Sequence, residues 1–366
     1  MVTIILFLSA IVLGQIFRKS RVCSLYILSV MYVLSAFRYW SADLENYILG
    51  YERSIIVTSS RYSGFGKFME FFRSNGFEFD DFMKIFYIVV LMCMFIAIIQ
   101  CTKNVNQVLS LYLIYSYGLD VIQMKTMIAE ALALLSLCIY FSRLDGIEIE
   151  NNRLNKIKII VFSGFLLLLS CSFHFSMVII FLIWMFFVFI KNYRNLPRKI
   201  LVVMLVSLVL VYLGFAVWMV QYASMLGVVG ELDYLLQWTE KSTNYGYFLS
   251  IGFIILYLFV RNQLLKIKSI SINSVQNSNI NIFLNTVIFL IPFLVLHMEF
   301  LRLFRIYMIL LYIVYSNIER KSLQSSSDIA RRLCFYFYLL LCFMNEPFAF
   351  YEWTLGALFK FNSLFN

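Results

Sequence analysis

The sequence predicts an all-α protein that crosses a membrane with about twelve helices. Apolar residues make up 62% of its 366 residues, and its mean hydropathy is +0.84. Charged residues make up only 14%, whereas a soluble domain has roughly 25%. Apolar runs of roughly 17–20 residues recur along the whole chain, and an α-helix of that length crosses the hydrocarbon core. We therefore expect a single transmembrane domain over residues 1–366.

The hydropathy pattern divides the chain into twelve predicted spans. In chain order they cover residues 2–17, 22–36, 82–101, 104–117, 121–141, 157–172, 175–190, 199–220, 246–261, 280–297, 299–317 and 331–348. The segment 271–279, SINSVQNSN, is a short polar linker between two of them.

Three apolar runs are predicted to contain two spans each. Residues 157–190 are apolar throughout, and both of their flanks are basic. One helix of this length would be about 51 Å long and would place its basic flanks on opposite sides of the membrane. We therefore predict two helices with a turn in SCSFHFS, residues 170–176. The same reasoning splits two more runs, 104–141 at YGLD (117–120) and 280–317 at LHME (296–299).

The charges of the connections predict which ends of the spans face the cytoplasm. The basic connections hold about nineteen of the thirty Lys and Arg residues, and they lie at 18–21, 103, 143–158, 191–199, 261–268 and 319–332. The other connections are acidic or nearly uncharged and include two large loops, 37–81 and 221–245. Lys and Arg collect in cytoplasmic loops, so we expect both large loops and both termini on the extracytoplasmic side. The net charge of +10 then reflects topology, and no nucleic-acid partner is expected.

The cysteine pattern indicates neither a disulfide framework nor a metal site. Seven cysteines lie in or beside apolar runs, and none has a CxxC or Cys/His ligand spacing. Cysteines in such positions are usually small core residues. We expect no cofactor and no metal.

Unusual polar residues cluster at the tips of the three outward hairpins. They are Asp120, Gln123 and Lys125; His174; and His297, Glu299, Arg302 and Arg305. Ionisable residues inside a membrane tend to face a cavity or a partner. Arg302 and Arg305 follow Glu299 at i+3 and i+6, so both guanidinium groups share one broad helix face and could bind a phosphate or pyrophosphate through bidentate bonds.

Simpler interpretations of these residues stay open. Lys125 and Arg302 could extend to the membrane interface. His174 could satisfy a backbone carbonyl in its turn. Asp43 could be a solvated loop acid.

The stretch FRYWSADLENY, residues 37–47, follows the second span and combines an arginine, two acids and several aromatic rings. Together with three other stretches it resembles the EpsG family of bacterial exopolysaccharide proteins, which belongs with the Wzy-type O-antigen and capsule polymerases. The other stretches are QMKTMIAEALAL (123–134), SCSFHFSMVIIF (170–181) and FLRLFRIYMIL (300–310). The family usually has an arginine near Lys125, and lysine keeps the charge but lacks the planar fork.

The resemblance implies a membrane glycosyltransferase with a GT-C-like helical fold. Such polymerases join oligosaccharide repeat units that are carried on undecaprenyl pyrophosphate, at the outer face of the bacterial cytoplasmic membrane. They use no nucleotide sugar and need no metal. The bilayer and the lipid-linked oligosaccharide are then the expected partners, and a chain-length regulator protein is a further candidate.

The resemblance and the polar residues together predict a site. The candidates for catalysis are His174 as the first choice of general base and Asp43 as the second. The expected pyrophosphate ligands are Arg302, Arg305, Arg38 and Lys125. The expected glycan contacts are Tyr47, Trp40, Gln123 and Glu299.

Two other functions stay open. A flippase for the same lipid-linked units would also suit twelve spans, although a transporter is expected to carry polar residues near the midplane and related halves. A membrane acyltransferase usually needs a catalytic histidine, and only His174 and His297 are present.

Overall fold

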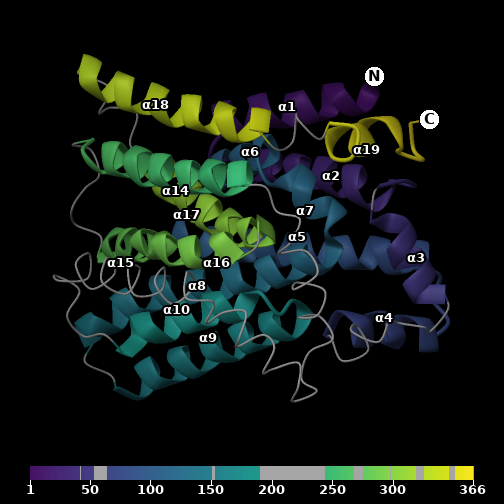
Figure 1. Cartoon of the computed structure of the whole chain (residues 1–366), viewed down its shortest axis with the longest axis horizontal. Coiled ribbons are helices and arrows are strands. Elements are labelled where there is room, and N and C mark those ends of the chain that lie inside the picture. Colours follow the sequence, from purple (N-terminus) through teal and green to yellow (C-terminus); the bar gives the residue numbers. More distant parts are fainter. Residues whose placement is uncertain are drawn as a thin grey trace.

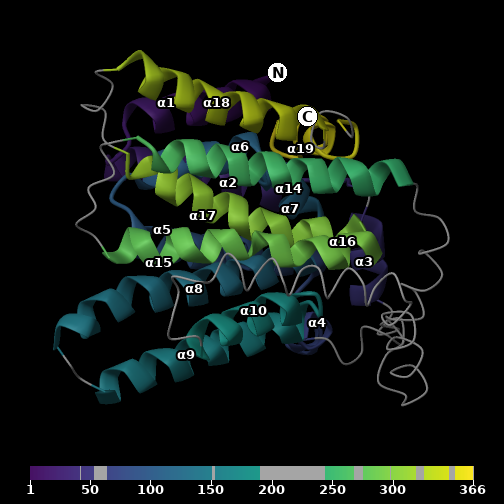
Figure 2. The same ribbon diagram turned by 60° about the vertical axis from the view of Figure 1, so that its left-hand side comes forward.

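A computed structural model describes residues 1–41, 43–52, 64–150, 153–189, 244–267, 275–296, 298–318, 325–345 and 351–365. These residues form a bundle in which long helices run side by side (Figure 1, Figure 2). The predicted span 199–220 and most of the loop 221–245 lie outside the described residues.

The first half of the chain holds ten described helices. They are α1 (Val2–Ile16), α2 (Arg21–Ala36), α3 (Leu44–Glu52), α4 (Gly64–Ser74), α5 (Phe79–Cys101), α6 (Val105–Ile114), α7 (Tyr117–Ile122), α8 (Met124–Glu150), α9 (Arg153–Phe173) and α10 (Met177–Phe189). The described elements that follow are α14 (Asn244–Leu265), α15 (Val275–Leu284), η2 (Asn285–Leu290), α16 (Ile291–Leu296), η3 (Met298–Leu303), α17 (Phe304–Ser316), α18 (Ser326–Phe343) and α19 (Leu355–Lys360).

The helix breaks that the sequence predicts are present. Helix α9 ends at Phe173 and α10 begins at Met177, so the turn lies within the predicted stretch. The run 104–141 is interrupted by the short helix α7, and α16 and η3 divide the run 280–317. The loop 37–81 differs from the prediction because it contains two helices, α3 and α4.

The centre of the bundle is formed by α6 and α17, which pack against each other. Every residue of α17 is buried, and so is every residue of α6 from Val105 to Leu113. A helix that is buried on all sides is surrounded by other helices. On one side of this centre α8 packs between α5 and α9, and on the other α14 packs against α18.

The outer helices expose apolar side chains at helical spacing. On α9 the exposed residues include Leu154, Ile157, Val161, Phe165 and Leu168. An apolar stripe facing outward is unfavourable in water and normal in lipid. Three described helices are long and apolar enough to cross a membrane, namely Phe79–Cys101, Met124–Arg143 and Leu154–Phe173. The fold is therefore that of a helical membrane protein, and the number of twelve spans and the GT-C likeness stay predictions.

Several basic connections meet at one end of the bundle, which we call the basic end (residues 17–20, 102–106, 266, 316–317 and 325–331). The side-chain amide of Asn106 donates hydrogen bonds to the backbone carbonyls of Phe17 and Ser20, at 2.5 and 2.8 Å. The side-chain amide of Asn104 donates a hydrogen bond to the backbone carbonyl of Ser316 at 2.5 Å. These polar side chains bind the carbonyls that helix ends leave without an intrahelical partner.

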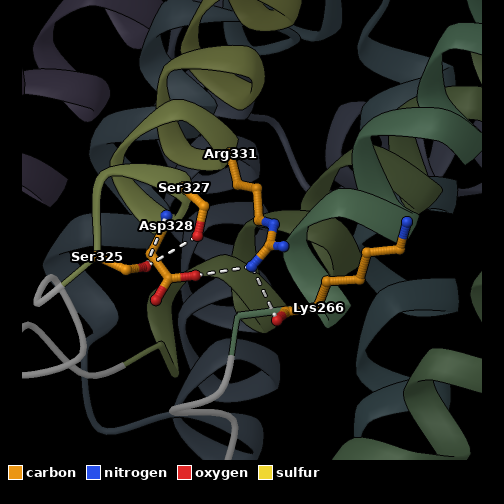
Figure 3. A network of polar contacts seen from close by, with 5 residues as sticks. All are labelled: Lys266, Ser325, Ser327, Asp328 and Arg331. Carbon is orange, nitrogen blue, oxygen red and sulfur yellow. Dashed lines mark hydrogen bonds and ion pairs between the residues drawn. The ribbon is translucent and has the colours of Figure 1, made fainter.

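The start of α18 belongs to the same end (Figure 3). The Ser325 hydroxyl accepts a hydrogen bond from the Asp328 amide at 3.2 Å and so caps the helix. Arg331 pairs with Asp328 at 2.8 Å and donates to the Lys266 carbonyl at 3.0 Å, which joins α18 to the end of α14.

The opposite end, which we call the site end, contains residues 37–47, α4, α7 and the α9–α10 turn. Both chain termini lie toward this end (Figure 1). The C-terminal tail pairs with the segment after α2, since the Tyr39 amide donates to the Phe361 carbonyl at 2.9 Å and the Ser363 amide donates to the Phe37 carbonyl at 2.8 Å. Helix α4 lies so close to the α9–α10 turn that a Cβ atom at Gly64 would come within 2.6 Å of the Ser172 hydroxyl.

Candidate functional site

A buried ion pair joins α17 to α7. The Arg305 guanidinium lies 2.7 Å from one Asp120 carboxylate oxygen, and it also donates to the Gln123 side-chain oxygen at 3.1 Å. The Tyr112 hydroxyl on α6 donates to the other Asp120 oxygen at 2.7 Å. Arg305 and Asp120 are both buried, so each charge depends on the other for its stability in the core.

This pair changes the interpretation of Arg305. The sequence predicted Arg305 as a pyrophosphate ligand on one helix face with Arg302, and the structure adds Asp120 as its partner. The backbone of Glu299 lies in η3, but its side chain is outside the described residues, as is the whole of His297. Asp120 lies at a hairpin tip that the sequence predicts, but its pairing with Arg305 is not predicted.

A second acid lies beside Asp120. Glu130 on α8 is 2% exposed, and its carboxyl group lies against that of Asp120. It lies within the electrostatic reach of Asp120, Arg302 and Arg305. Glu130 therefore adds a second buried carboxyl group beside the Asp120–Arg305 pair.

Arg38 supports α7. It is 2% exposed, and its guanidinium group donates to the Val121 carbonyl and lies 5.7 Å from the centre of the Tyr87 ring. The Tyr87 hydroxyl donates to the same carbonyl at 2.9 Å. Because Val121 follows Asp120, Arg38 fixes the backbone that presents Asp120 to Arg305. Among the described contacts Arg38 has this supporting role, and its role as a pyrophosphate ligand stays a prediction.

Three cations from separate segments converge on His174. Lys125 on α8, Arg302 in η3 and Arg305 on α17, which we call the cationic cluster, all act on its imidazole ring. Burial, together with these three positive charges, holds the pKa of His174 well below its usual range. His174 is therefore neutral at physiological pH.

The ring of His174 is held by its own turn. Nδ1 lies 3.3 Å from the backbone nitrogen of Ser176 and 2.7 Å from its hydroxyl oxygen. His174 follows the last residue of α9, and its carbonyl accepts a hydrogen bond from Met177 at the start of α10.

The first residues of α3 reach the same place. The Tyr47 hydroxyl lies against the backbone amide of Lys125, within the electrostatic reach of Asp43 and Arg302. Burial, followed by the charge of Asp43, raises the pKa of Tyr47, so its hydroxyl stays protonated. The Tyr47 ring packs on Phe65 of α4 at 5.5 Å between centroids. The stretch 37–47 therefore delivers a phenol to the cationic cluster and a carboxylate beside that phenol.

Trp40 lies apart from this group in the contacts described. Its side chain is 42% exposed and packs on Phe361 of the tail at 4.9 Å between ring centroids. Gln123 lies at the break before α8 and binds Arg305, as described above.

A cavity of about 570 Å³ opens between α3, α4 and the start of α5. It is lined by Ile48, Tyr51, Glu52, Arg73, Glu78, Phe79 and Asp80. The cavity shares helix α3 with Tyr47, and its lining is aromatic and acidic apart from Ile48 and Arg73.

The arrangement suits an anion with several oxygen atoms. Arginine binds phosphate oxygens through two parallel hydrogen bonds, and lysine adds a point charge. The described residues include no group of three His, Cys, Asp or Glu side chains that could hold a metal ion. The described side chains can stabilise negative charge through the cationic cluster, donate hydrogen bonds from His174 and Tyr47, and accept a proton at a carboxylate.

Comparison with known proteins adds the family. No curated protein and no solved structure matches the chain. The EpsG family matches residues 21–355, which include all ten predicted site residues. The chain therefore belongs to the EpsG family, the family of Wzy-type polysaccharide polymerases.

Proposed function

We propose that this protein is a glycosyltransferase that joins oligosaccharide repeat units carried on undecaprenyl pyrophosphate, at the outer face of the bacterial cytoplasmic membrane. A sugar hydroxyl of one lipid-linked repeat attacks the anomeric carbon of the chain on a second carrier. The new glycosidic bond forms, the bond to the pyrophosphate oxygen breaks, and undecaprenyl pyrophosphate leaves. The proton of the hydroxyl passes to a base, for which His174 and Asp43 are the candidates.

The observation that carries this proposal is the convergence of Lys125, Arg302 and Arg305 on His174, beside Tyr47 and Asp43. Positive groups fixed before the reaction stabilise negative charge that develops on a leaving group. Arg302 is only half-buried and Lys125 likewise, so both are accessible to a ligand. Arg305 is balanced by Asp120 and orients this group more than it binds the anion.

The glycan has a surface nearby. The cavity beside α3 carries the aromatic side chains of Tyr51 and Phe79 together with the acids Glu52, Glu78 and Asp80. Aromatic rings offer an apolar face to sugar C–H groups, and carboxylates accept hydrogen bonds from sugar hydroxyls. This cavity is the proposed path of the glycan next to the pyrophosphate site.

A deletion strain tests the proposal against a flippase. Loss of a polymerase leaves single capped repeat units on the cell surface, whereas loss of a flippase leaves none outside. We expect single repeats in the deletion strain and long chains after complementation with the wild-type gene. A surface without any repeat units would contradict the polymerase and support a transporter.

A further inference from the structure

We propose that His174 binds the pyrophosphate leaving group as a neutral hydrogen-bond donor through Nε2–H, and that Ser176 is the positioning residue that sets this state. The proposal rests on the proposed function and assigns the base role to Asp43 in place of His174.

The position of the ring follows from the turn. The His174 amide donates to the Ser170 carbonyl at 3.0 Å, and the His174 carbonyl accepts from the Met177 amide at 3.0 Å. The backbone is therefore fixed on both sides of the residue. The side chain folds forward, so that Nδ1 meets both the amide and the hydroxyl of Ser176.

These contacts select one tautomer. A backbone N–H can only donate a hydrogen bond, so the Nδ1 atom that faces the Ser176 amide must offer a lone pair. A neutral imidazole carries its single proton on the other nitrogen. Nε2 is therefore protonated, and the one nitrogen of His174 that could accept a proton is already occupied by Ser176.

The surrounding charges favour the same state. Lys125, Arg302 and Arg305 approach from α8, η3 and α17, and each disfavours a positive imidazolium. Helix α10 contains no ionisable residue, and α4 contacts the turn through Gly64 and Phe68. No described acid is recorded as acting on His174 that would counter these cations.

A neutral donor has a clear use beside three cations. It gives the departing pyrophosphate one more hydrogen bond without adding a positive charge to the cationic cluster. The attacking hydroxyl must lose its proton elsewhere, and the Asp43 carboxylate lies within the electrostatic reach of Tyr47, on which Arg302 also acts. The electron pair of the broken C–O bond stays on the pyrophosphate, and the hydroxyl proton moves to Asp43.

The tautomer can be measured directly. The chain has two histidines, so ¹⁵N-histidine NMR of the whole protein in nanodiscs gives two sets of signals, and a His297→Gln variant assigns them. We expect a bare Nδ1 and a protonated Nε2 at His174, unchanged between about pH 8 and about pH 5.5, because the ordinary value is about 6.5. Inorganic pyrophosphate should shift the Nε2 signal. A proton on Nδ1, or titration near the ordinary value, would overturn the proposal.

Activity separates the donor from a base. Glutamine places an amide N–H near the position of Nε2 but cannot take up a proton, so His174→Gln should keep polymer synthesis within about tenfold of wild type, whereas His174→Ala should lose about 10²-fold or more. Equal losses in the two variants would contradict the donor role.

Ser176 has a matched control in the same turn. Ser176→Ala should lower activity several-fold and allow the Nδ1-protonated form to appear in the spectrum, and Ser176→Thr should restore both. Ser172→Ala should change neither, since the Ser172 hydroxyl is exposed and donates to the Leu169 carbonyl. An unchanged spectrum in Ser176→Ala would remove Ser176 from the proposal. Failure of the polymerase assignment would show as a deletion strain without repeat units on its surface and would leave the tautomer measurement intact.

Discussion

The two ends of the bundle use polar side chains in different ways. At the basic end, Asn104, Asn106 and Arg331 bind the carbonyls of Ser316, Phe17 and Lys266, so the contacts finish helix ends. At the site end, ionisable side chains from remote segments act on one another, as Arg305 does with Asp120 across 185 residues of sequence.

This contrast shows that the number of charges in a segment indicates its side of the membrane, whereas the burial of charges indicates a functional site. The basic connections hold most of the Lys and Arg residues, and their composition indicates membrane orientation. The site end has fewer cations, but three of them act on one neutral histidine. Burial of charge is unfavourable unless a partner or a ligand offsets it, so the site end is where function is expected.

The largest difference between the two ends should appear in a cysteine-labelling test of which side of the membrane each end faces. Ser74 is exposed at the end of α4, and Lys19 is exposed in the α1–α2 connection. A Ser74→Cys variant should react with a membrane-impermeant thiol reagent in intact cells whose outer membrane, if present, is permeabilised, and a Lys19→Cys variant should not. The parent protein with its seven cysteines sets the background. The reverse pattern would invert the proposed orientation. Ser59 lies in the same loop as Ser74, residues 37–81, but outside the described residues.

The next largest effect should come from the buried ion pair. Arg305→Ala leaves Asp120 buried without its cation, and loss of one partner of such a pair typically destabilises a protein by about 3–5 kcal/mol. We expect much less folded protein in the membrane, measured by fluorescence-detected size-exclusion chromatography.

A double variant, Arg305→Met with Asp120→Leu, is the control for this prediction. It removes both charges, so the amount of folded protein should recover while polymer synthesis stays low. Normal folding of Arg305→Ala alone would show that Asp120 does not depend on Arg305.

A smaller effect is expected from pH. The pKa of His174 is lowered in the folded protein, so below the ordinary value of about 6.5 the unfolded chain binds more protons. Stability should therefore rise with pH up to about 6.5 and level off above it. The unfolding midpoint should differ less between about pH 5.5 and about pH 7.5 in His174→Gln than in wild type. An equal difference would indicate that His174 is not shielded from protonation.

The smallest effect is expected at the basic end. Arg331 is partly exposed, and exposed ion pairs typically contribute about 0–1 kcal/mol. Arg331→Ala should lower the thermal midpoint slightly and leave polymer per folded molecule unchanged. A large loss of activity would mean that the basic end also contributes to the reaction.

The sequence predicts the helices and the hairpin tips better than it predicts the contacts. Span length and charge alternation located the turn at His174, because a bilayer limits helix length. The pairing of Arg305 with Asp120 depends on how α17 packs against α7, and helical spacing carries no information about that contact. For the same reason the sequence did not predict that Arg38 binds the Val121 carbonyl. Helices α3 and α4 were missed because they are short and amphipathic within a loop that hydropathy separates from the spans.

The most direct test of the central claim is polymer made per folded molecule in Arg302→Ala. Arg302 belongs to the cationic cluster and is half-buried, so its removal should leave the protein folded. Loss of one group that stabilises charge in a transition state costs about 10²–10³-fold in rate. We expect such a loss, with single repeat units still reaching the surface, and partial activity at most in Arg302→Lys, because lysine lacks the two-pronged contact. Wild-type chain length per folded molecule in Arg302→Ala would contradict a pyrophosphate site at the cationic cluster.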